Sequence, residues 1–157
     1  MKPSKSLFCP IRKIWVADLP EENIRQNLIK KLIDDLGYPQ GQIGLEVSLS
    51  HLPHLIGMKS IPRRRADLIV FAKDLHPKYA LFPLLLIECK SVEINPKVFR
   101  QIVGYNQFVG ACCIGAVNHS LSLVGWFNSH CNDFSFFSEI PSYEILLNFA
   151  RQKWLYR

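Results

Sequence analysis

The sequence lacks the long apolar run that a membrane-spanning helix requires. None of its 157 residues lies in a stretch approaching the ~20 apolar residues needed to cross a bilayer. The basic N-terminus has no apolar segment before Arg12 and Lys13, so we expect no secretory signal peptide. We therefore expect a cytoplasmic protein that does not work at a membrane.

Cysteine is present, but not in a pattern that indicates disulfides. The five cysteines are an odd number and none belongs to a C-x-x-C pair, which fits a reducing compartment. The cysteines and histidines between residues 112 and 131 match no standard spacing of zinc ligands. We therefore favour an apolar strand over a zinc site at residues 112–117.

The sequence also lacks internal repeats, linkers and a nucleotide-binding glycine loop. Its eight glycines form no G-x-x-x-x-G-K-[ST] pattern, so the chain is not expected to carry an ATP-driven motor. The length predicts one domain over residues 1–157, and the 48% hydrophobic content excludes wholesale disorder. A net charge of +6 favours an anionic partner, although small basic proteins without such a partner are frequent.

Two short apolar runs are the most informative feature that is present. They cover residues 65–71 and 83–90, and each has the length and composition of a buried strand. The residues between them, 72–82, are polar enough for a connecting loop. The sequence therefore predicts two strands that are neighbours in a sheet.

Charged residues stand at the matching ends of these runs. Asp67 opens the first run; Glu88 and Lys90 close the second on one face, while Cys89 points to the other. Adjacent strands would place Asp67 beside Glu88, and two carboxylates with a main-chain carbonyl suit Mg²⁺ or Mn²⁺. A lysine beside the ion can orient or deprotonate a water that attacks a phosphodiester. The alternative is a structural ion pair between Lys90 and a carboxylate.

An amphipathic helix is expected between Asp18 and Gly37. Asp18 can cap it, and Glu21 occupies the capping-box position three residues later. Apolar residues then recur at helical spacing until Gly37 ends the run. Glu22 has no such structural role, and Arg25 shares its face of the helix.

A strand with one wet face is predicted over residues 42–50, followed by a loop over residues 51–62. Arg63, Arg64 and Arg65 come directly after this loop. They are either a solvated loop end or contacts to DNA phosphates.

A second helix is predicted from a cap at Asn95 to Gly110. Gln101 and Tyr105 share one of its faces, and Arg100 adds a cation next to them. The alternative is that Tyr105 is simply a core residue and Gln101 a surface residue.

The rest of the chain adds strands and one helix. Apolar segments at residues 112–117 and 121–127 flank a turn at residues 118–120. A further strand is predicted at residues 134–137 and an amphipathic helix at residues 141–154. The core order α-β-β-β-α-β predicts an α/β fold, a mixed sheet flanked by helices.

The spacing D-x20-E-x-K formed by Asp67, Glu88 and Lys90 resembles the PD-(D/E)xK nuclease superfamily. The stretch Pro-Glu-Glu-Asn-Ile-Arg-Gln at the first helix and the Gln-xxx-Tyr pair in the second extend the likeness. Over about residues 18–118 the chain looks like the N-terminal nuclease domain of type I restriction endonuclease motor subunits. Residues 119–157 would add the C-terminal strands and helix. The resemblance implies a restriction-endonuclease-like mixed sheet.

The resemblance also implies a function and a site. The expected activity is divalent-metal-dependent endonucleolytic hydrolysis of DNA, and the alternative is an inactive nucleic-acid-binding or assembly module. A homodimer and a motor or specificity partner acting in trans both stay open. The implied catalytic and metal-binding residues are Glu22 (with Glu21 as the alternative), Asp67, Glu88, Cys89, Lys90 and Gln101. The implied DNA-contacting residues are Arg63, Arg64, Arg65 and Arg100.

Overall fold

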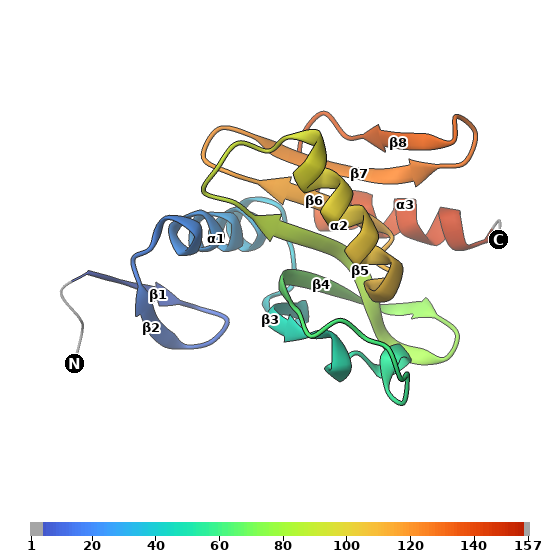
Figure 1. The fold of residues 1–157 in the computed structure, drawn as a ribbon, viewed down its shortest axis with the longest axis horizontal. Coiled ribbons are helices and arrows are strands. Elements are labelled where there is room, and N and C mark those ends of the chain that lie inside the picture. Colours follow the sequence, from blue (N-terminus) through green and yellow to red (C-terminus); the bar gives the residue numbers. More distant parts are fainter. Residues whose placement is uncertain (1–4, 156–157) are drawn as a thin grey trace.

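The protein is built on a six-stranded sheet with the strand order β3-β4-β5-β6-β7-β8 (Figure 1). The computed structural model describes the backbone of residues 5–155 and the side chains of residues 5–153. Neighbouring strands are antiparallel, except that β5 and β6 pair in parallel. The mixed sheet confirms the predicted restriction-endonuclease-like α/β fold class. Its strands are Ile43–Ser48, Arg65–His76, Tyr79–Cys89, Cys113–Val117, Ser122–Asn128 and Asp133–Phe136.

Three helices cover the two faces of this sheet. Helix α2 (Pro96–Val109) connects the parallel strands β5 and β6 and packs on one face through Ile102. Helices α1 (Pro20–Lys30) and α3 (Tyr143–Leu155) pack on the other face. In the described part of the chain no helix is both long and apolar enough to cross a membrane.

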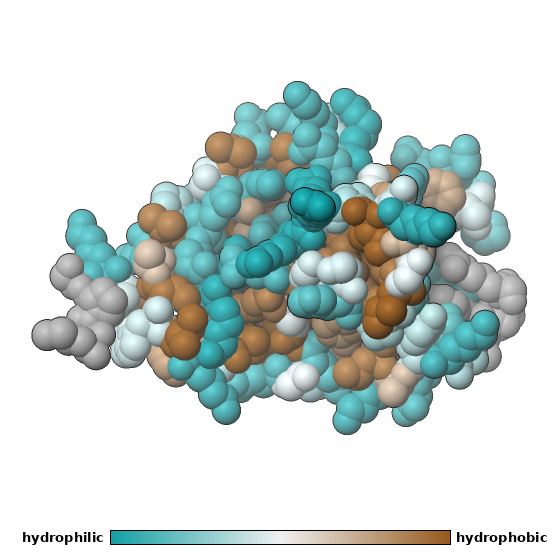
Figure 2. Space-filling model, turned by 60° about the horizontal axis from the view of Figure 1, so that its bottom comes forward, coloured by the Kyte–Doolittle hydropathy of each residue, from teal (hydrophilic) through white to brown (hydrophobic). Residues whose placement is uncertain are grey.

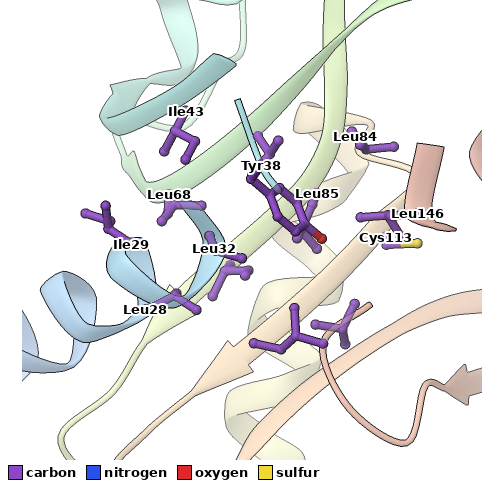
Figure 3. Close-up of a cluster of buried hydrophobic side chains, with 14 of the residues drawn as sticks. Leu28, Ile29, Leu32, Tyr38, Ile43, Leu68, Leu84, Leu85, Cys113 and Leu146 are labelled. Atoms are coloured by element: carbon purple, nitrogen blue, oxygen red, sulfur yellow. The ribbon is translucent and has the colours of Figure 1, made fainter. Parts of the chain in front are cut away.

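The larger cluster of buried side chains lies under α1 and α3 (Figure 3). Leu28 and Leu32 of the first helical segment point toward Leu68 and Leu85 of the central strands. Each such side chain contributes about 1.5–3 kcal/mol when it is fully removed from water. Tyr38 closes the cluster, and its hydroxyl donates to the Pro141 carbonyl at 2.9 Å. This layer fixes α1, which carries Glu22 and Arg25, against the strands.

Two predicted helix ends are confirmed. The Asn95 side chain accepts a hydrogen bond from the Val98 N–H at 3.0 Å, and Gly110 ends α2 at φ 72°. Gly37, at φ 71°, follows a π-helical turn over Lys31–Asp35 that extends α1. The helical apolar pattern therefore marked both C-termini correctly.

The predicted cap at Asp18 is wrong. Leu19 is the N-cap of α1 and no side chain caps this helix end. Pro20 takes the first helical position, where its fixed φ angle favours the helix and its missing N–H costs nothing. The Asp18 carboxylate instead accepts a hydrogen bond from the Asn23 side chain at 3.2 Å.

The predicted loop over residues 72–82 is also wrong. Strand β4 continues to His76 and β5 already begins at Tyr79, so a short turn connects them. Ala72 and Phe82 of these extensions are buried, whereas Lys73 is exposed. The polar, solvent-facing residues of the β4–β5 extensions made this segment resemble a loop in the sequence.

A second, two-stranded sheet precedes α1 and was not predicted. Strand β1 (Ser6–Cys9) pairs antiparallel with β2 (Ile14–Ala17), and Phe8 lies opposite Trp15. Each strand has only four residues, too few to show a reliable alternation. Figure 1 shows this hairpin beside the end of the main sheet where β3 and α1 lie.

The predicted turn after β6 is confirmed. The Asn118 side-chain oxygen accepts the N–H groups of Ser120 and Leu121 at 3.0 and 2.8 Å. Its amide nitrogen donates to the Val92 carbonyl at 3.0 Å, which fastens the loop after β5. Asn118 therefore has a structural role at the end of the sheet where β5 terminates.

Candidate active site

The ends of β4 and β5 bring Asp67 and Glu88 together. Leu68 lies opposite Ile87 in the antiparallel register, so the preceding Asp67 faces Glu88 across the two strands. The Cys89 N–H donates to Asp67 Oδ2 at 2.9 Å, and the Asp67 N–H donates to Glu88 Oε1 at 3.4 Å. Each carboxylate is thus held by the backbone of the neighbouring strand, and the two acids lie side by side.

The environment of Glu88 disfavours its negative charge. Burial, followed by the charge of Asp67, raises the pKa of Glu88 to about 8, and the charge of Lys90 is a smaller influence in the opposite direction. Among the side chains of residues 5–153, no ion pair joins Glu88 or Lys90 to an opposite charge. The described side chains therefore include no pairing of Lys90 with Asp67 or Glu88, although Asp67 does pair with Arg25.

Lys90 and Glu88 line one small hollow together with residues of α2 and the arginine segment. The backbone of Lys90 is fixed because its N–H donates to the Val117 carbonyl of β6 at 2.9 Å. Gln101, Tyr105 and Arg64 complete the polar part of the lining. The structure thus brings together residues from three parts of the chain that the sequence analysis had singled out.

Tyr105 carries a hydroxyl group without a partner in this hollow. Its side chain is buried, and within the described residues its Oη forms no hydrogen bond. Burial, followed by the charge of Glu88, raises the pKa of Tyr105 to about 12, so the phenol keeps its proton. The Arg64 guanidinium lies 5.1 Å from the ring centroid. A buried donor of this kind is available to a water or a phosphate oxygen that enters the hollow.

Arg25 connects Asp67 to helix α1. This side chain is buried, and its Nη2 lies 3.4 Å from Asp67 Oδ1 while its Nη1 lies 3.3 Å from Glu22 Oε2. The other oxygen of Glu22 is 2.6 Å from Arg12 Nη2 and accepts from Gln26 at 2.8 Å. Both oxygens of Glu22 are therefore engaged, and this acid contacts Asp67 only through Arg25.

Glu46 is a further acid of this network, and the sequence analysis missed it. Its carboxylate lies 3.3 Å from Arg12 and 3.6 Å from Arg25, so the same two arginines hold both Glu22 and Glu46. The Glu46 backbone has a φ of 49°, an unfavourable conformation for a residue with a side chain. The alternating pattern of the strand had marked Glu46 only as part of its wet face. Arg12 and Glu46 are 34 residues apart, so no local spacing linked them.

Glu21 differs from its neighbour Glu22. It is exposed, and in the described part of the chain its carboxylate forms no hydrogen bond or ion pair. Burial raises the pKa of the Cys89 thiol to about 12, with Asp67 as the next cause and Glu21 among the weaker ones. Glu21 therefore forms no described bond to the acid pair.

The arginine segment before β4 lies at the same end of the sheet. Arg63, Arg64 and Arg65 are exposed, and Arg65 is the first residue of β4, two positions before Asp67. Arg100 is exposed on α2 next to Gln101. Arg64 is the member of this group that reaches the hollow.

The donor set at the acid pair suits a hard divalent cation. The described residues contain no group of three or more histidines, cysteines or acids that could hold a metal ion. Mg²⁺ commonly uses only one or two carboxylates and completes its shell with water and phosphate oxygens. Asp67 and Glu88 provide such a pair, and among the described side chains Glu88 has no cationic partner within bonding distance.

A helix-flanked mixed sheet with an acid pair and a lysine at the ends of two central strands defines a restriction-endonuclease-like protein. The chain belongs to the family described as type I restriction enzyme R protein N terminus, whose model matches residues 20–141. Comparison with curated proteins and with solved structures gave no match. The family match confirms the resemblance drawn from the sequence and supports a nuclease-like role. It spans all strands of the main sheet but leaves out the β1–β2 hairpin.

Proposed function

We propose that this chain is a Mg²⁺- or Mn²⁺-dependent DNA phosphodiesterase whose reaction takes place at Asp67 and Glu88. The observation that carries this proposal is the acid pair itself. Two carboxylates lie at adjacent strand ends, one with a pKa raised by burial, and neither is paired with the lysine beside them. A fold gains no stability from such an arrangement, whereas metal-dependent hydrolysis of a phosphodiester can make use of it.

Each residue of the site has a proposed role. Asp67, Glu88 and the main-chain carbonyl of Cys89 would hold the cation, which when bound polarises the phosphate and lowers the pKa of a bound water. Lys90 is the water-positioning base: it orients the attacking water within the hollow and, in its neutral amine form, accepts the proton of that water. Gln101 orients the same water or a phosphate oxygen from the rim.

Glu22 is proposed as an accessory acid that acts through Arg25. Since both of its oxygens bind arginines, its contribution is to hold Arg25 against Asp67 and so to orient the metal-binding carboxylate. Glu21, which is exposed and unpaired among the described side chains, is the alternative for direct contact with water or metal.

Arg63, Arg64, Arg65 and Arg100 are proposed to bind DNA phosphates. All four are exposed at or near the end of the sheet that carries the acid pair. Phosphate contacts of this kind provide affinity that does not depend on sequence.

Substitution of Lys90 tests the proposal. We expect Lys90→Ala to reduce cleavage of plasmid and oligonucleotide DNA by a factor on the order of 10² or more, because a proton-transfer group is lost. DNA binding should persist. Lys73→Ala is the matched control, since Lys73 is an exposed lysine at the opposite end of β4.

Two results would count against the proposal. A Lys90→Ala protein that cuts DNA as fast as the parent would remove Lys90 from the mechanism. A parent protein that binds DNA but cuts none with either Mg²⁺ or Mn²⁺ would identify the chain as an inactive binding module.

A further inference from the structure

The β1–β2 hairpin is fastened directly to the acid network, although it lies outside the residues matched by the family model. Arg12, in the connection between the two strands, bonds Glu22 at 2.6 Å and Glu46 at 3.3 Å. Arg25 bonds the same two acids and also Asp67. One layer of ion pairs therefore separates the hairpin from the candidate metal site.

The two faces of the hairpin differ in their surroundings. Its inner face packs on the main core, where Cys9 is fully buried and Val16 is half-buried. Its outer face presents Phe8, 50% exposed, and Trp15, 44% exposed, with ring centroids 5.5 Å apart in an edge-to-face arrangement. Figure 2 shows apolar surface at this end of the molecule, with polar side chains beside it.

The charge of this segment favours an anionic partner. Residues 5–17 contain no aspartate or glutamate; Arg12 is paired with Glu22 and Glu46, and Lys5 and Lys13 are the other two cations. Lys13 is exposed at the turn, in a left-handed conformation with φ 55°. Exposed aromatic rings within a basic segment are the combination that proteins use to bind single-stranded nucleic acid, since bases stack on the rings and cations attract the phosphates.

We propose that the outer face of the hairpin, with Phe8 as the principal stacking side chain, binds unpaired nucleotides of the DNA strand that enters the site. The inference rests on the proposed nuclease function and names its substrate class, DNA that contains a single-stranded segment. On the other side of the acid pair, exposed Arg64, which lies over the buried Tyr105 ring, provides a further cation for the same strand. Residues on both sides of the acid pair would then hold one strand.

The test is binding of fluorescein-labelled oligo(dT) and of a blunt duplex to the full chain in EDTA, where no cleavage occurs. We expect the parent to prefer oligo(dT) and Phe8→Ala to weaken this binding about tenfold, the effect of losing one stacked base. Duplex binding should change little. Phe8→Leu keeps the apolar packing of the hairpin but removes the aromatic face, so it should show the same loss even if Phe8→Ala unfolds.

Phe136→Ala is the matched control. Phe136 is 44% exposed and packs against one other ring, Phe99, at 5.2 Å, but it lies on β8 at the far edge of the main sheet. Its substitution should leave oligo(dT) binding unchanged. The proposal is overturned if Phe8→Leu binds oligo(dT) as tightly as the parent, or if it weakens duplex and oligo(dT) equally. Either result would point to a protein partner or a structural role for the ring. Because these measurements need no cleavage, they stand or fall separately from the Lys90 experiment.

Discussion

Glu88 is held as a neutral acid in the metal-free protein because burial and the adjacent Asp67 both disfavour its charge. Its pKa is raised from an ordinary value of 4.5 to about 8 in the folded protein. Between these values the folded protein holds a proton that the unfolded chain has released, so stability falls as pH rises through this window. Below pH 4.5 both states are protonated and the penalty is absent.

Thermal melts as a function of pH check this sign. The parent in EDTA should lose melting temperature between about pH 4.5 and 8, and Glu88→Gln should lose much less, because glutamine does not ionise. At pH 8, Glu88→Gln should be at least as stable as the parent. A variant that melts far lower than the parent would mean that Glu88 is a partner in a stabilising ion pair.

Mg²⁺ should stabilise the folded parent, because it favours the ionised form of Glu88 that rising pH otherwise makes costly. If the site binds Mg²⁺ with a Kd near 1 mM, then 10 mM Mg²⁺ adds about 1.4 kcal/mol to the stability of the parent. Glu88→Gln, which lacks one of the two carboxylates, should gain much less. Melts of both proteins with and without Mg²⁺ measure the difference, and an equal shift in both would place the ion elsewhere.

Tyr105 and Tyr38 form a matched pair of buried tyrosines. The Tyr38 hydroxyl bonds the Pro141 carbonyl, whereas the Tyr105 hydroxyl has no partner among the described residues. Tyr38→Phe should therefore cost about 1 kcal/mol of stability and leave cleavage unchanged, while Tyr105→Phe should cost no stability. If the Tyr105 hydroxyl donates to water or phosphate during the reaction, cleavage should fall about tenfold. Unchanged cleavage by Tyr105→Phe would make this side chain a core residue only.

At the scale of elements, the ion-pair network joins the hairpin, α1, β3 and β4 through two arginines. Arg25 is buried and faces three carboxylates, whereas the Arg12 side chain is 22% exposed and faces two. Removing Arg25 leaves those acids without their central cation in a poorly solvated place. We therefore expect Arg25→Met to lower the free energy of unfolding by about 3–5 kcal/mol.

Arg12→Met should cost less, about 1 kcal/mol, because the Arg12 side chain is partly exposed and Arg25 still pairs with both acids that Arg12 contacts. Urea unfolding of both variants measures the two costs. Equal and small losses of unfolding free energy would show that the network is a surface feature that does little to position Asp67.

The elements that local patterns define were predictable, and those that depend on distant partners were not. The apolar run that Asp67 opens and the run that Glu88 closes identified strands β4 and β5, and Asn95 with Gly110 gave the bounds of α2. The register of two adjacent strands then sufficed to place the acids together. The hairpin and the role of Glu46 depend on Arg12, whose partners are 10 and 34 residues away. Ion pairs between such distant residues leave no periodic pattern from which they could be predicted.

At the scale of the whole molecule, the positive net charge contrasts with the negative charge of the candidate site. The chain carries a net charge of +6, yet its candidate site is a cluster of acids. Cations near that cluster compensate for it, since Arg12 and Arg25 neutralise its acids and Arg63–Arg65 present positive charge beside it. A polyanion can then approach two carboxylates that would otherwise repel it.

The salt dependence of duplex binding tests whether these cations act locally or only through net charge. Each phosphate contact contributes about 0.9 to the slope of log affinity against log salt concentration, so replacing both Arg63 and Arg64 by alanine should reduce the slope by about 1.8. Lys73→Ala with Lys78→Ala is the matched control, because it removes the same charge from the opposite end of β4 and β5. If local contacts dominate, the arginine pair flattens the slope and the lysine pair does not. Equal effects of the two pairs would show that binding follows net charge, and no effect of the arginine pair would make those residues a solvated loop end.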